Sequence, residues 1–161
     1  MKIYLKRDKS DENSRYIVYS ESGEILYKIF GSYKSHVEKI YVMQDSKCIA
    51  KMRETHLGNF RTCYVTTAED NFYIAMKCSR EKVAVTFRGA GFHIRGNVFE
   101  KSYDIMNIDN SVVGVVSRQF LTSADALMIN IYEDKYELCC IACAVFFDTA
   151  CVIDTSALQA T

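Results

Sequence analysis

The stretch YELCCIACAVFFDTACVI, residues 136–153, is the longest apolar stretch in this chain of 161 residues. Asp134 and Glu137 at its beginning form a variant of the capping box, so a helix with Asp134 as its N-cap is expected here. Leu138 to Phe147 would be apolar on every side of that helix. A helix that is apolar all round lies inside a protein or inside a membrane.

The length of this stretch favours the interior of a protein. Its uninterrupted apolar run of residues 138–147 ends at Asp148, whereas a bilayer span needs about 20 predominantly apolar residues. Asp148 near a bilayer centre would cost about 2.5–3.5 kcal/mol. No Lys or Arg follows to anchor the far side, and the small residues Cys139, Cys140 and Ala142 favour close packing. We therefore expect a buried helix and no transmembrane span.

The remaining chain is typical of an all-β protein. Many short segments alternate apolar and polar residues with period two, as in residues 82–88, where Val83, Val85 and Phe87 share one face. Gly, Asp, Asn and Ser mark short connections, which favours antiparallel hairpins. Twelve strands are predicted, over residues 2–7, 15–20, 25–30, 36–43, 47–54, 61–68, 72–78, 82–88, 92–99, 102–108, 111–119 and 126–133.

A closed sheet would suit both parts of the chain. Twelve antiparallel strands seldom stay open, since closure removes exposed edges. A barrel of that width has an interior that strand side chains alone do not fill. We therefore predict a mainly β fold: a twelve-stranded antiparallel closed β-barrel with a buried C-terminal central hydrophobic helix, in a single domain over residues 1–161.

Residues 92–150 resemble the LURP-one-related proteins of the tubby C-terminal-like superfamily. The similar features are the motifs at 94–97 (IRGN), 102–105 (SYDI) and 116–119 (VSRQ), then Asp125 and the closing apolar helix. The early hairpin at 16–29 is also similar. The resemblance implies a tubby-like barrel of twelve strands threaded by its C-terminal helix. The family often has a Trp after the basic position of strand eleven, where Phe120 stands nearby here.

Charge is balanced overall but uneven along the chain. Lys and Arg total 20, as do Asp and Glu, so no net field favours nucleic acid. Residues 77–101 are locally basic. Tubby domains bind phosphoinositide headgroups through basic barrel surface, so the resemblance raises the possibility of a lipid or anion site here; a solvated barrel exterior is the alternative. The candidate residues are Arg80, Lys82, Arg88, Arg95 and Lys101.

The seven cysteines indicate a reducing location rather than a disulfide framework. Their odd number, their irregular spacing and an N-terminus without an apolar signal sequence favour a cytoplasmic protein. Cys140 and Cys143 have CxxC spacing, but no second ligand pair accompanies them. We expect Cys139, Cys140 and Cys143 to be buried and structural, with no metal and no cofactor.

The sequence has no recognisable catalytic motif. GxSxG and HExxH are absent, and His36, His56 and His93 lie in separate segments. The oxygen donors of residues 104–110 lack the spacing of a calcium loop and are typical of a turn. The expected function is therefore a non-enzymatic binding or scaffold domain for a protein partner or an anionic lipid surface. The alternative is a hydrolase or redox enzyme that pairs a histidine with Cys63 or Cys78 across strands.

Overall fold

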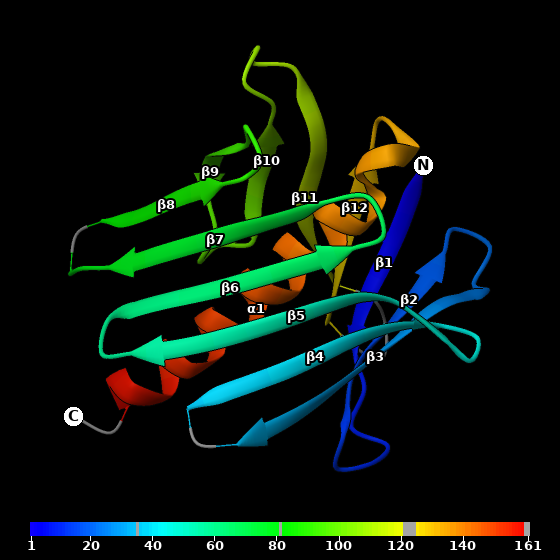
Figure 1. Cartoon of the computed structure of the whole chain (residues 1–161), viewed down its shortest axis with the longest axis horizontal. Coiled ribbons are helices and arrows are strands. Elements are labelled where there is room, and N and C mark those ends of the chain that lie inside the picture. The colour runs from blue at the N-terminus through cyan, green and yellow to red at the C-terminus, as the bar shows by residue number, and fades with distance from the viewer. Residues whose placement is uncertain (35, 81, 121–124, 160–161) are drawn as a thin grey trace.

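The computed structural model describes residues 1–34, 36–80, 82–120 and 125–159, apart from the side chains of 33, 34, 120 and 151–159. Within these residues the chain forms twelve strands, a 3-10 turn η1 (Asp134–Tyr136) and a helix α1 (Glu137–Gln159) (Figure 1). The strands are β1 (Lys2–Arg7), β2 (Ser14–Ser20), β3 (Ile25–Lys34), β4 (Val37–Gln44), β5 (Lys47–Leu57), β6 (Phe60–Thr67), β7 (Asn71–Cys78), β8 (Val83–Arg88), β9 (His93–Asn97), β10 (Ser102–Met106), β11 (Val112–Phe120) and β12 (Asp125–Ile131).

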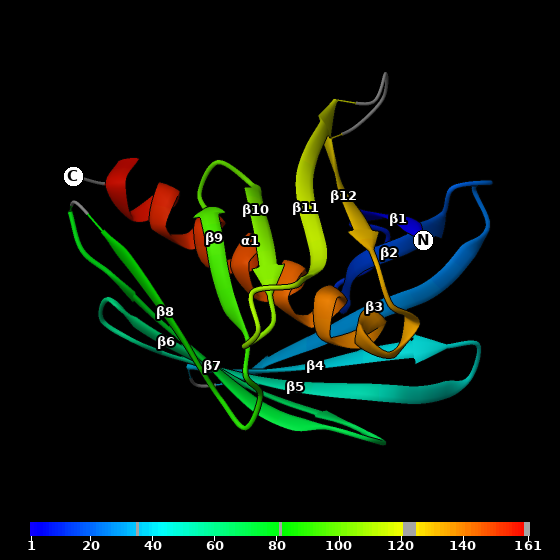
Figure 2. The same cartoon turned by 90° about the horizontal axis from the view of Figure 1, so that it is seen from above.

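All twelve strands belong to one antiparallel sheet that curls into a nearly closed barrel. Its order is β8-β7-β6-β5-β4-β3-β2-β1-β12-β11-β10-β9. β1 pairs with β12, with Ile3 opposite Ile129, so the first and the last strand of the chain are neighbours in the sheet. This confirms the predicted twelve-stranded antiparallel barrel. Closure is incomplete at one place, because no backbone pairing joins β8 to β9 among the described residues and the two strands spread apart (Figure 2).

Helix α1 passes through the interior of this barrel (Figure 2). Every residue from 139 to 148 is buried, and Phe146 and Phe147 are each 1% exposed. Phe147 packs edge-to-face on Tyr103 of β10, with ring centroids 5.4 Å apart. The wall also approaches closely at Gly114 of β11, where an added Cβ would lie 2.7 Å from the Cys140 Sγ. The predicted central helix is therefore confirmed; the end of the stretch 136–153, from residue 151 on, lies outside the described side chains.

Asp148 is buried but is paired with basic side chains from two parts of the barrel. Its Oδ2 is 2.9 Å from the Arg7 Nη2, and its Oδ1 is 2.8 Å from the Lys101 Nζ. The Tyr16 hydroxyl donates a 2.7 Å hydrogen bond to Oδ2. Because the charged carboxylate is paired and hydrogen-bonded, it ties the helix to β1, β2 and the β9–β10 turn.

The start of the helix differs from the prediction. Asp134 lies in the 3-10 turn, whose N-cap is Glu133 without a side-chain cap, and α1 begins at Glu137. Glu137 accepts a hydrogen bond from the Tyr27 hydroxyl on β3 at 2.8 Å instead of closing a capping box. The Glu137 carboxylate is therefore used in a tertiary contact with the barrel wall. No helix among the described residues has both the length and the hydrophobicity needed to cross a membrane.

Candidate functional site

The outer surface of β4 to β8 carries basic side chains and no acidic one. Alternation fixes which residues face outward: on β7, for example, Phe72, Ile74 and Met76 are buried, so Tyr73 and Lys77 point to solvent. The outward positions of these five strands include no Asp or Glu. We define the basic face as the exposed side chains of Lys39, Lys51, Arg53, Lys77, Lys82 and Arg88.

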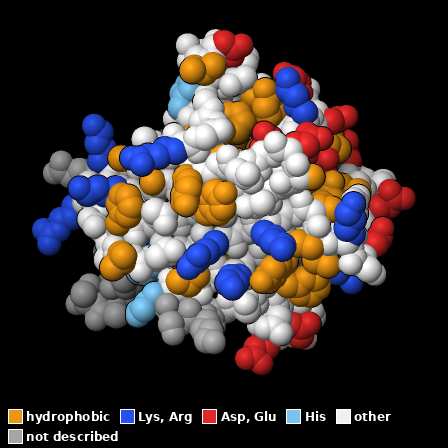
Figure 3. Space-filling model, viewed as in Figure 1, with side chains coloured by type: hydrophobic (Ala, Val, Ile, Leu, Met, Phe, Trp, Pro, Cys, Tyr) orange, Lys and Arg blue, Asp and Glu red, His pale blue; other side chains and the backbone are white. Residues whose placement is uncertain are grey.

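Figure 3 shows this surface from outside. Lys and Arg side chains lie among apolar and neutral ones over the centre of the view, and acidic side chains lie toward its edges. None of the six residues of the basic face forms an ion pair within the part of the chain that the structure describes. The six positive charges are therefore available to an external anion.

Strand pairing aligns three of these residues with two tyrosines. Lys39 is opposite Arg53, Arg53 is opposite Tyr64, Tyr64 is opposite Tyr73, and Tyr73 is opposite Arg88. The Tyr64 and Tyr73 rings pack with centroids 4.6 Å apart. Two cations directly opposite each other repel, so the Lys39–Arg53 pair costs stability that a bound anion would recover.

A shallow depression accompanies this row. It has a volume of about 240 Å³ and is lined by side chains of β4, β5 and β6: Lys39, Tyr41, Lys51, Met52, Arg53, Tyr64 and Thr66. Cations and aromatic rings in one depression can hold a phosphate and the apolar or ring part of a headgroup together.

The five predicted site residues separate into two groups. Arg88 lies outward at the end of β8 with Ala84 and Thr86, as alternation predicts; Lys82 is exposed directly before β8, and Arg80 lies in the same β7–β8 turn. The unpaired gap between β8 and β9 is called the seam. On its other side, Arg95 forms an ion pair with Asp104 at 2.5 Å and Lys101 forms one with Asp148 at 2.8 Å. A site made of all five residues stays a prediction, and the last two already have a carboxylate partner.

Sequence reasoning missed Lys39, Lys51 and Arg53. They lie on β4 and β5, outside the locally basic segment 77–101, and reach the same surface only through strand pairing. The signal was present in the alternation: all outward positions of residues 37–43, 51–57, 60–66 and 71–77 lack an acidic residue. Counting charge by face rather than by segment would have found it.

The unpaired seam holds a second cavity, of about 540 Å³. On the β8 side it is lined by Arg80, Lys82, Val83 and Val85, and on the β9 side by Ile94 and Phe99 among others. The inward side chains of β8 are only half-buried, because no strand covers their free edge. Arg80 and Lys82 therefore lie at the border between this seam and the basic face.

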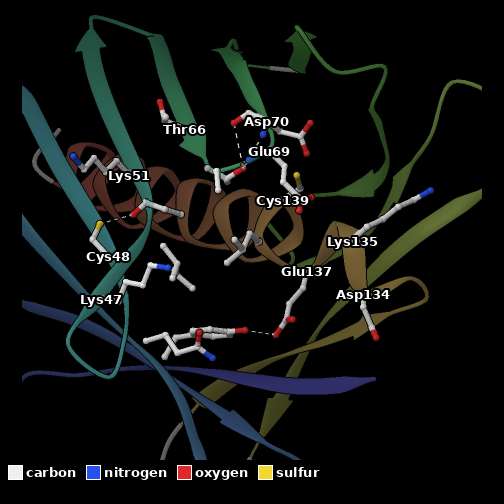
Figure 4. A pocket seen from close by; sticks show the side chains of 17 residues that line it. Lys47, Cys48, Lys51, Thr66, Glu69, Asp70, Asp134, Lys135, Glu137 and Cys139 are labelled. Atoms are coloured by element: carbon white, nitrogen blue, oxygen red, sulfur yellow. Dashed lines mark hydrogen bonds between the residues drawn. The ribbon is translucent and has the colours of Figure 1, made fainter.

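A third cavity, of about 700 Å³, opens where α1 enters the barrel (Figure 4). Figure 4 shows Glu137 and Cys139 from α1 across from Cys48 and Lys47 on β5, with Glu69 and Asp70 at the rim. Burial raises the pKa of the Cys139 thiol to about 12, so it is protonated at neutral pH. No histidine occurs among the described residues that line the cavity.

Cys63, one of the two cysteines of the predicted enzyme alternative, is a buried thiol with a raised pKa. Cys63 is buried opposite Glu54, and burial, with the Glu54 charge, raises its pKa well above the usual value. Burial likewise raises the pKa of Cys140 to about 12 and that of Cys143 well above its usual value. These thiols are buried, as expected for Cys139, Cys140 and Cys143. Among the described residues, no group of three or more His, Cys, Asp or Glu could hold a metal ion.

The β10–β11 connection is a local turn. Asp109 accepts hydrogen bonds from the Ser111 amide and hydroxyl, and these hydrogen bonds lower the pKa of Asp109. Asn110 adopts a φ of 65°. Residues 107–111 thus satisfy one another, as the turn interpretation predicts.

The comparison with known families agrees with the fold. A family model described as LURP-one-related matches residues 1–148. The chain belongs to the LURP-one-related family. A solved X-ray structure of a protein from Arabidopsis thaliana is similar, with a TM-score of 0.58 and 14% identity over 92% of this chain and 90% of that chain. At that identity the likeness shows the fold alone. A search of curated proteins found no match.

Membership of the LURP-one-related family suggests a non-catalytic domain. The cavity at the start of α1 offers polar groups but, in its described lining, no histidine. The basic face is the feature of this LURP-one-related chain that has the clearest chemical preference, because the outward positions of β4 to β8, all of them described, hold cations and no Asp or Glu.

Proposed function

We propose that this LURP-one-related chain is a non-enzymatic binding domain that docks on anionic phospholipid surfaces through its basic face. The observation that carries the proposal is the absence of any acidic side chain from the outward positions of five consecutive strands, which together with Lys82, directly before β8, present six cations. A merely solvated surface ordinarily mixes both signs of charge. The chain has no net charge overall, but its basic face can still attract an anionic surface, because positive charge is concentrated there.

The electrostatic free energy expected from the basic face fits reversible docking. A Lys or Arg near an anionic bilayer contributes about 1 kcal/mol, so three or four engaged at once contribute about 3–4 kcal/mol. Such attraction acts only within a Debye length, about 8–10 Å at ordinary salt. Binding should therefore be weak, fast and strongly dependent on ionic strength.

The proposed location is the cytoplasm, at an inner membrane surface. The six described cysteines are all free thiols, which suits a reducing compartment. Anionic lipids such as phosphatidylserine and phosphoinositides give the cytoplasmic leaflet its negative potential. We propose no nucleic acid ligand and no cofactor.

Vesicle co-sedimentation tests this function. The chain is mixed with vesicles of phosphatidylcholine alone, or with added phosphatidylserine or phosphoinositide, over a salt series. We expect pelleting only with anionic vesicles and its loss at high salt. The charge-reversed variant Lys51→Glu/Arg53→Glu should bind at least about tenfold more weakly, because four units of charge are lost from the face.

A matched variant controls for net charge. Lys2→Glu/Lys9→Glu changes the total charge equally at exposed positions of β1 and the β1–β2 turn, and should bind like the unmodified chain. Equal weakening by both variants, or no pelleting with any anionic vesicle, would contradict the proposal. Soluble inositol phosphate and a short single-stranded oligonucleotide serve as further probes. Binding of either one without binding to vesicles would contradict lipid docking and would indicate that the ligand of the basic face is a free phosphate compound or a nucleic acid.

A further inference from the structure

The β5–β6 hairpin ends in an exposed apolar tip. Leu57 is 75% exposed and Phe60 is 42% exposed, on either side of Gly58 and Asn59. Gly58 has a φ of 59°, which a tight turn requires and Gly tolerates best. Scattered exposed apolar residues are normal, but two large ones at one hairpin tip form a local patch that favours an apolar environment.

The tip is held firmly. The Asn59 Nδ2 donates to the Cys78 carbonyl at 3.0 Å, and the Cys78 amide donates to the Asn59 carbonyl at 3.0 Å. The His56 Nε2 lies 2.6 Å from the Gly58 carbonyl and donates to it. Because these bonds brace the turn against β7, Leu57 and Phe60 cannot simply fold back to bury themselves.

Basic residues of the neighbouring β7–β8 hairpin lie on one side of the tip. Phe60 is directly opposite Lys77, and of the described residues in the β7–β8 turn, Arg80 and Lys82 are exposed. Figure 1 shows the β5–β6 and β7–β8 turns at the same end of the barrel. An apolar tip with a basic border matches the layering of a membrane surface, where anionic headgroups lie just outside the acyl chains.

We propose that the hairpin tip, Leu57 and Phe60, inserts into the interfacial region of an anionic bilayer and sets the orientation of the docked domain. Lys77, Arg80 and Lys82 then lie at headgroup level. The row Lys39–Arg53–Tyr64–Tyr73–Arg88 lies two rows of the sheet further back, about 13 Å along the strands. This inference rests on the proposed function, and it adds a second, apolar contribution that is insensitive to salt.

The sequence offers a clean probe, because it contains no tryptophan. In Phe60→Trp the single indole reports directly on the tip. With phosphatidylserine-containing vesicles its emission should shift to shorter wavelength, and lipids brominated along the acyl chain should quench it. Ile108→Trp is the matched control: Ile108 is 79% exposed on the β10–β11 turn, another part of the barrel, and its indole should stay in water (Figure 1).

A second variant measures the contribution of the tip. Leu57→Ser/Phe60→Ser should keep the thermal melt of the unmodified chain, because both side chains are already exposed. Its affinity for anionic vesicles should fall about tenfold or more, and the residual binding should be entirely abolished by salt.

Each outcome separates this inference from the proposed function. Vesicle binding with a shifted and quenched Phe60→Trp but an unchanged Ile108→Trp supports insertion of the tip. Vesicle binding with neither shift nor quenching at residue 60, or with equal changes at both sites, overturns the inference while the basic face stays supported. Absence of vesicle binding by the unmodified chain overturns both.

Discussion

Glu54 is a buried acid that the barrel holds in an unfavourable place. It lies on β5 directly opposite Glu38 on β4, and its Oε1 is buried with no hydrogen-bond partner among the described residues. Burial, aided by the Glu38 charge, raises the pKa of Glu54 to about 8, although Arg61 acts in the opposite direction. At neutral pH this carboxyl is therefore mostly protonated.

This raised pKa predicts a loss of stability as pH rises. The unfolded chain releases the proton near pH 4.3, whereas the folded chain keeps it until about pH 8, so folding binds a proton within that window. Stability falls through the window and levels off above it. The variant Glu54→Gln cannot ionise and should be more stable than the unmodified chain at pH 9, by roughly 2–5 kcal/mol relative to their difference at pH 5. Urea unfolding between pH 5 and 9 measures this.

The exposed residue Glu24 supplies the comparison for that experiment. Glu24→Gln makes the same substitution at an exposed position of the β2–β3 turn and shows how much of the change any Glu→Gln substitution causes. Parallel profiles for the unmodified chain and Glu54→Gln would show that Glu54 is ionised in the folded chain.

At the scale of the elements, Asp148 decides how α1 is fixed in the barrel. Burial alone would raise its pKa, but the hydrogen bonds from Lys101 and Tyr16 and the charge of Arg7 outweigh burial and lower the pKa. Asp148→Ala leaves Arg7 and Lys101 without their shared carboxylate. We expect a loss of about 2–4 kcal/mol of unfolding free energy, below the value for a fully buried pair because the cations are partly exposed.

The pH dependence of this contact has the opposite sign to that of Glu54. A lowered folded pKa means that the contribution of Asp148 is complete above its unfolded value near pH 3.9 and is lost as pH falls through the folded value.

The variant Asp125→Ala is the control for Asp148→Ala. It breaks the exposed ion pair with Arg118 and should cost at most about 1 kcal/mol of unfolding free energy. Equal effects of the two variants in denaturant melts would refute the anchoring role.

The elements themselves were largely predictable, whereas contacts between them were not. Period-two alternation located all twelve strands to within a few residues, and the all-round apolar stretch located the helix, because both signals are local. The predicted start of α1 was wrong: Asp134 does not cap the helix, and the Glu137 carboxylate accepts a hydrogen bond from Tyr27, 110 residues away, instead of closing a capping box. The pairing of Lys101 with Asp148 could not be foreseen either, since charge in sequence does not reveal a partner across the barrel.

At the scale of the whole molecule, the site was only half predictable. Lys82 and Arg88 could be placed outward from one strand alone. The alignment of Arg53 with Tyr64 and Tyr73 depends on the register of three strands. Alternation shows which face of the sheet a residue is on, but it does not show which residue lies opposite it on the next strand. The order of a meander sheet is the simplest antiparallel choice, so summing charge over the outward face of successive hairpins is a usable rule for related barrels.

The barrel and its helix should fold only together. Ile141, Val145, Phe146 and Phe147 are each at most 1% exposed, and full burial of such a side chain contributes about 1.5–3 kcal/mol. The four therefore contribute about 6–12 kcal/mol, comparable with the whole stability of about 5–15 kcal/mol of an ordinary domain. A chain truncated after Lys135 should be insoluble or unfolded, and Phe147→Ala in the full chain should lower the unfolding free energy by about 3–5 kcal/mol. Expression followed by a thermal melt checks both. A soluble truncated chain that melts cooperatively would show that the β-sheet holds its shape without α1, and the central helix would then be an accessory rather than the core.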